Sequence, residues 1–150
     1  MTPTTIVGHY LRAAALNDVA AQDRLPTDPA GTSADGLVDA ALDVVLGRRF
    51  PAGHSVHEVT VLARKMCRRY PEAGIRVIDA EALLRHRLGE ATPIDEIDDA
   101  TVRDTKIMAF ATLVELLGLY PAELDSLLAH AEALAVERGY APTPLPTPGR

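Results

Sequence analysis

Hydrophobic residues recur at intervals of three and four along most of the chain, which is the spacing of amphipathic α-helices. Residues 75–78 have the β-branched character of a strand, but the sequence offers no second strand, so they are interpreted as an extended connection. The helices that the pattern predicts span residues 3–23, 34–46, 56–70, 80–88, 100–117 and 121–138. The predicted fold class is therefore all-α, a compact bundle of five or six helices.

Two of these predicted helices carry further local signals. The helix over 56–70 begins with a capping box, in which the Ser55 hydroxyl accepts from the backbone N–H of Glu58 and the Glu58 carboxylate accepts from the N–H of Ser55. The helix over 100–117 is the most hydrophobic element, with Phe110 on its apolar stripe. It is expected to lie at the centre of the core.

The chain divides by composition into four segments. A length of 150 residues is typical of a single domain. Two prolines, a glycine and small polar residues make 26–33 a linker, which joins an N-terminal helix in residues 1–25 to a helical domain of residues 34–140. Residues 141–150 contain four prolines and are expected to form a disordered tail. The linker leaves open whether the first helix docks on its own domain or on another subunit.

The single cysteine, Cys67, indicates a reducing compartment, because no internal disulfide can form. The neighbouring Arg64 and Arg68 could lower the pKa of its thiol, but the thiol is interpreted as buried or incidental. No apolar run approaches the about 18 residues that cross a membrane, and the first residues lack the pattern of a signal peptide. We therefore expect a soluble, cytoplasmic protein without a membrane partner.

Charge is distributed unevenly along the chain. The formal net charge is −6, yet residues 48–87 contain nine Lys or Arg against four Asp or Glu, a local charge of +5. The remaining residues therefore carry −11. Such asymmetry predicts a basic face on two of the helices. The basic side chains that form this candidate binding face are Arg64, Lys65, Arg68, Arg69, Arg85 and Arg87.

Three partners for the basic face stay open. The acidic segment 90–104, with six carboxylates, could neutralise it within the chain, and a nucleic acid or an acidic protein could bind it from outside. A helix-turn-helix is disfavoured, because the connection 71–78 exceeds the usual turn of about 3–4 residues and the next helix starts with Asp79 and Glu81. Arg outnumbers Lys by 13 to 2, a compositional bias that weakens any argument from a single Arg.

Signals for catalysis or metal binding are weak. His54 and His57 have a spacing at which two helical side chains can share an ion, but no third ligand follows from the sequence. The chain lacks metalloprotease patterns, a phosphate-binding loop and a nucleophile elbow, and we expect no cofactor. The leading prediction is a non-enzymatic helical interaction module, regulatory or adaptor-like, whose partner is another protein or a second copy in a homodimer. A nucleic-acid-binding regulator is the alternative, and a small helical enzyme is the third hypothesis.

Overall fold

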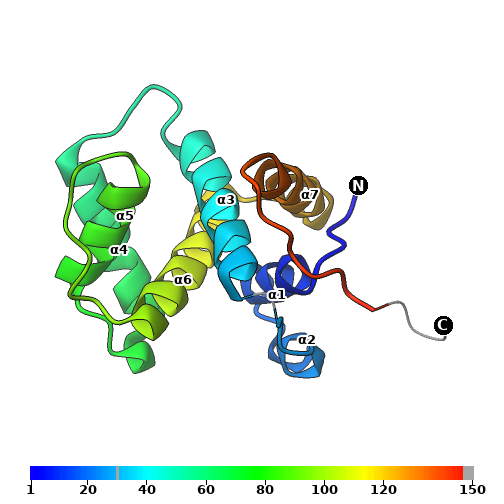
Figure 1. The fold of residues 1–150 in the computed structure, drawn as a ribbon. Coiled ribbons are helices and arrows are strands. Elements are labelled where there is room, and N and C mark those ends of the chain that lie inside the picture. Colours follow the sequence, from blue (N-terminus) through cyan, green and yellow to red (C-terminus); the bar gives the residue numbers. More distant parts are fainter. Residues whose placement is uncertain (30, 147–150) are drawn as a thin grey trace.

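The predicted all-α class is confirmed by the computed structural model, which describes residues 1–29 and 31–146 (Figure 1). Seven α-helices form in this part of the chain, one more than the upper predicted number. A short 3-10 helix, η1, adds one turn after the fourth helix. The elements are α1 (Ile6–Ala15), α2 (Val19–Arg24), α3 (Gly31–Arg49), α4 (Val56–Arg69), η1 (Pro71–Ala73), α5 (Val77–Arg87), α6 (Asp99–Leu117) and α7 (Pro121–Glu137).

The core lies where α3 and α6 pack against each other in the middle of the molecule (Figure 1). α1 and α7 cover one side of this pair, and α4 and α5 cover the other. Phe110 and Leu113 of α6 are fully buried, and Leu37 and Leu42 of α3 are at most 1% exposed. The hydrophobic stripe predicted for 100–117 therefore faces the centre of the core, as expected.

The capping chemistry predicted for α4 is present. The Ser55 hydroxyl accepts from the Glu58 N–H at 3.1 Å, and the Ser55 N–H donates to the Glu58 carboxylate at 3.1 Å. α6 also has a side-chain cap, because Asp98 accepts from the N–H of Thr101 at 3.2 Å. Gly118 ends α6 with a φ of 62°, a left-handed conformation that glycine adopts without steric cost.

The prediction of one helix over residues 3–23 is wrong, because two helices occupy this stretch. α1 ends at Ala15, and Asn17 takes a left-handed φ of 56°. Asn tolerates this conformation better than most residues, and Asp18 then caps α2 by accepting from the N–H of Ala21 at 3.0 Å. The left-handed conformation of Asn17 and the cap at Asp18 therefore outweigh the high helix propensity of the alanines around them.

Two other helices begin earlier than predicted. α3 starts at Gly31, within the predicted linker 26–33, and it continues through Gly47 to Arg49. α5 starts at Val77 rather than after Asp79, so the predicted extended connection is partly helical. Asp79 then lies in the first turn of α5, where its carboxylate accepts from the Arg76 guanidinium at 3.0 Å.

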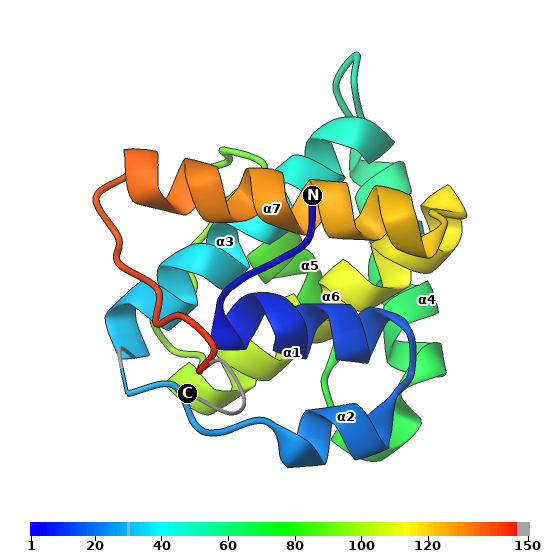
Figure 2. The ribbon, with the colours of Figure 1, turned by 90° about the vertical axis from the view of Figure 1, so that its right-hand side faces the viewer.

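The start of α1 is held by a buried carboxylate on α7. Glu132 is 9% exposed and accepts from the backbone N–H of Thr4 at 3.0 Å and of Thr5 at 2.8 Å, and from the Thr5 hydroxyl. Residues 141–146 of the predicted tail run beside this segment, with the N–H of Ile6 donating to the Thr143 carbonyl at 3.0 Å (Figure 2). The rest of that tail, 147–150, lies outside the described residues.

Candidate functional site

Three of the six predicted binding residues share one solvent-facing stripe of α4. Arg64, Lys65 and Arg68 are exposed and make no ion pair within the part of the chain that the structure describes. At about 100° per residue they fall, together with two further exposed residues, within roughly 100° of the helix circumference. We call this stripe the α4 outer face; its residues are His57, Val61, Arg64, Lys65 and Arg68.

The other three predicted binding residues are engaged with carboxylates of the chain. Arg87 donates to both oxygens of Asp43, at 2.7 and 2.8 Å. This bidentate hydrogen bond is the main reason that the pKa of Arg87 is raised. Arg69 pairs with Glu115, and Arg85 lies 3.9 Å from a carboxylate oxygen one turn earlier on α5. The structure therefore divides the predicted basic face into a free group and a paired group.

The Arg87 pair belongs to a network between α3 and its neighbours. Asp43 also forms an ion pair with Arg138 at 2.9 Å. Asp39 forms ion pairs with Arg87 at 3.3 Å and with Lys106 at 2.7 Å. Three cations from three elements thus surround two carboxylates of α3. This arrangement joins helices of the fold and leaves these cations unavailable to a partner.

The acidic segment 90–104 does not neutralise the α4 outer face in the described structure. Its one ion pair with the basic stretch joins Glu90 to His54, at 3.2 Å. Asp98 caps α6, and this hydrogen bonding from Thr101 lowers the pKa of the Asp98 carboxyl. The partners of the basic stretch come instead from α3, α5 and α6.

The candidate metal residues do not converge. His54 contacts Glu90, and its ring lies 6.1 Å from the ring of Phe50. His57 is exposed on the first turn of α4. Among residues 1–29 and 31–146, no three His, Cys, Asp or Glu side chains are grouped so that they could hold a metal ion.

Cys67 lies beside the outer face but is partly buried. Burial raises the pKa of its thiol, because the thiolate would lose solvation. The cations on either side of it in the sequence do not reverse this effect, since Arg64 and Arg68 extend into solvent. An activated nucleophile is therefore not indicated here.

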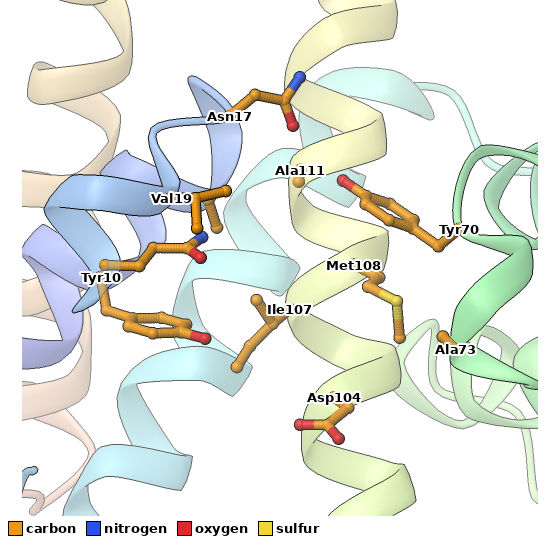
Figure 3. Close-up of a pocket in the computed structure, with 11 residues that line it drawn as sticks. Tyr10, Asn17, Val19, Tyr70, Ala73, Asp104, Ile107, Met108 and Ala111 are labelled. Atoms are coloured by element: carbon orange, nitrogen blue, oxygen red, sulfur yellow. The ribbon is translucent and has the colours of Figure 1, made fainter.

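A cavity of about 310 Å³ over α6 is a second candidate site, which no pattern in the sequence predicts (Figure 3). Tyr10 of α1 and Tyr70 at the end of α4 approach from opposite sides, with their hydroxyls directed toward α6. Asp104 lies at one end of the cavity and Asn17 at the other. The remaining lining residues are Ala14, Val19, Gln22, Ala73, Ile107, Met108 and Ala111.

A neighbouring cavity of about 330 Å³ continues from the first toward the start of α3. Both cavities are lined by Tyr10, Gln22, Asp104 and Ile107. The two cavities therefore adjoin and form one groove along α6, with α1 and α2 on one side and, at the first cavity, Tyr70 and Ala73 on the other. We call it the α6 groove.

Protein-family models, curated proteins and solved structures provide no match to this chain. No helix in the described ranges is both long and apolar enough to cross a lipid bilayer. The α4 outer face and the α6 groove are therefore the two candidate sites from which a function can be inferred.

Proposed function

We propose that the chain is a non-enzymatic interaction module whose α4 outer face binds an acidic, amphipathic segment of a protein partner. The observation that supports this most strongly is the exposure of Arg64, Lys65 and Arg68 without any carboxylate partner among the described residues. Like charges one turn apart on a helix cost roughly 0.2–0.5 kcal/mol per pair. A partner that brings carboxylates to this face removes that repulsion and gains attraction from all three cations.

Charge and shape favour an acidic protein over a nucleic acid. Arg64 and Arg68 are one turn apart, about 6 Å along the helix axis, so the face reaches few phosphates. Nucleic-acid interfaces are strongly positive, whereas this chain carries −6 overall. Val61 lies among the cations and is 47% exposed, which offers an apolar contact that a phosphate backbone cannot use.

The geometry of the face suits a helical partner. Its residues follow the spacing i, i+3, i+4, i+7 from Val61 to Arg68, and a partner helix with the same spacing would place carboxylates and an apolar residue opposite them. Electrostatic attraction of this kind accelerates association and sets orientation, while the apolar contact lengthens the life of the complex.

The test is fluorescence anisotropy with a labelled 16-residue peptide that carries Glu and Leu at helical spacing. The full chain is expected to bind it at low salt, and the variant Arg64→Gln/Lys65→Gln/Arg68→Gln is expected to bind about tenfold more weakly, since exposed ion pairs contribute roughly 0.2–1 kcal/mol each. The matched control is Arg24→Gln/Arg48→Gln/Arg49→Gln, which removes the same charge from exposed residues elsewhere. Equal affinity in the two triple variants would contradict the proposal.

Two further probes separate the alternatives. A labelled DNA duplex at the same concentration should bind more weakly than the peptide. If the duplex binds more tightly than the peptide and its affinity falls steeply with salt, the nucleic-acid alternative is favoured over the protein partner. Sedimentation velocity of the chain alone tests whether a second copy is the acidic partner. Self-association that disappears in the Arg64/Lys65/Arg68 variant and persists in the control would assign that role to a second copy.

A further inference from the structure

We propose that the α6 groove binds a small organic amine, with the ammonium group at Asp104 and an aromatic or branched aliphatic body over Ile107, Met108 and Ala111. This site is separate from the α4 outer face and does not depend on the function proposed for it. The size is suitable, because the two connected cavities measure about 310 and 330 Å³ and ligand pockets begin at roughly 300 Å³.

The charged side chain that lines the cavity favours a positively charged ligand. Asp104 is the one charged side chain lining the cavity of Figure 3, and it makes no ion pair within 4.0 Å among the described residues. Its neighbour Arg103 is already engaged, since its guanidinium donates to Asp35 at 2.7 and 3.1 Å. Asp104 is exposed and acts electrostatically on Arg103, but in the described part of the chain it forms no ion pair of its own. A cation in the cavity would gain an ion pair with this carboxylate, whereas an anion would be repelled by it.

The walls of the groove suit an apolar body with a cationic end. Tyr10 and Tyr70 direct their hydroxyls toward α6 from the two sides (Figure 3). Ile107 and Met108 lie between them on α6 and form an apolar floor. A tyrosine ring attracts an ammonium group that lies over its face, and the hydroxyl supplies a hydrogen-bond acceptor.

Two amides provide further polar groups in the cavity. Asn17 and Gln22 line the cavity, and neither makes a side-chain hydrogen bond within the part of the chain described. Asn17 has a left-handed backbone, with φ 56°, and is exposed at one end of the cavity. Few polar groups in a mostly apolar cavity are typical of a site that orients a small ligand.

The test is an NMR titration of the full, isotope-labelled chain with three probes of similar size: phenethylamine, 2-phenylethanol and phenylacetate. Phenethylamine is expected to give saturable shifts at Tyr10, Asp104 and Met108, with a dissociation constant on the order of 1 mM, as expected for so few atoms. The neutral alcohol should bind up to about fivefold more weakly, because it lacks the ion pair with Asp104, and phenylacetate should not saturate. Equal or tighter binding of phenylacetate, or the lack of saturable shifts with the amine, would overturn the proposal.

Variants make the test specific. Asp104→Asn should weaken phenethylamine by up to about fivefold, because Asp104 is exposed and forms a single ion pair with the amine. The variant should leave the alcohol unchanged, while Glu137→Gln, which removes one exposed charge from α7, should change neither. Ala73→Leu fills the cavity from an exposed position of η1, so it should abolish binding of both probes without disturbing the core. Amine affinity that is unchanged in Asp104→Asn, or in Ala73→Leu, would show that the shifts come from another site.

Discussion

Charged side chains between helices, around Asp43 and Glu132, differ from those on the α4 outer face in whether they have partners within the fold. Around Asp43 each cation meets a carboxylate on a different helix, and Glu132 meets three donors at the start of α1. On the α4 outer face Arg64, Lys65 and Arg68 meet no carboxylate in the described structure. Charged groups between helices thus stabilise the fold, whereas charged groups on one outer helix are available to a partner.

The difference arises from position in the bundle. α3 lies between α5, α6 and α7, so its carboxylates are surrounded by other elements. α4 packs with α5 and α6 on one side and faces solvent on the other. Substitutions in the two regions should therefore have opposite effects on stability and on binding.

The largest effect is expected at Glu132. Glu132→Ala leaves the N–H groups of Thr4 and Thr5 without their buried acceptor, so the free energy of unfolding should fall by about 2–4 kcal/mol. Urea denaturation followed by circular dichroism measures this change. Glu137→Ala, on the exposed end of the same helix, should stay within about 0.5 kcal/mol of the parent chain. Equal losses in the two variants would show that the buried acceptor is not what stabilises this end.

A smaller loss is expected when the α3 network is broken. Arg87→Met keeps most of the side-chain volume but leaves Asp39 and Asp43 with fewer counter-charges, and it should cost about 1–3 kcal/mol. Arg85→Met is the matched control on α5, because its ion pair is long, at 3.9 Å. A stability of Arg87→Met equal to that of Arg85→Met would mean that the short bidentate pair of Arg87 with Asp43 stabilises the fold no more than the long ion pair of Arg85 does.

The α4 outer face should respond in the opposite way. Arg64→Gln/Lys65→Gln/Arg68→Gln should leave the unfolding free energy within about 0.5 kcal/mol, with a shift toward greater stability, because repulsion along the helix is relieved. The same variant should lose binding to the acidic peptide. A loss of stability as large as that of Arg87→Met would mean that these cations have partners within the fold.

The smallest effect concerns the reactivity of Cys67. Because burial raises the pKa of the thiol, the folded chain should reach a given thiolate fraction only at higher pH than a free cysteine does, and alkylation by iodoacetamide at neutral pH should be slower. The rate should rise when urea unfolds the chain. In the Arg64/Lys65/Arg68 variant the rate should change less than twofold, and a severalfold decrease would show that these cations act on the thiol.

Signals carried by neighbouring residues were predictable from sequence. The capping box of Ser55 and Glu58, the apolar stripe of α6 and the stop at Gly118 each depend on a few adjacent positions. The break at Asn17 was not predicted, because a favourable cap at Asp18 competes there with a strongly helical composition. Helix propensity alone could not decide between them.

The candidate sites required contacts between distant residues. Arg87 and Asp43 are 44 positions apart, so the sequence could not show that Arg87 is paired while Arg64 is free. The α6 groove combines Tyr10, Tyr70 and Asp104 from three separate elements. Such convergence depends on how helices cross, which hydrophobic spacing along one helix does not specify.

The hydrogen bonds between Thr5 and Glu132 also have a consequence for biosynthesis. The two residues are 127 positions apart, so at ribosomal rates of about 5–20 residues per second α1 emerges roughly 6–25 s before its anchor is made. Until α6 and then α7 have been synthesised, the apolar side of α1, including Leu11, lacks the helices that cover it in the folded chain. α1 is therefore among the last of the described helices to be secured, and its apolar side is open to a chaperone until α7 is made.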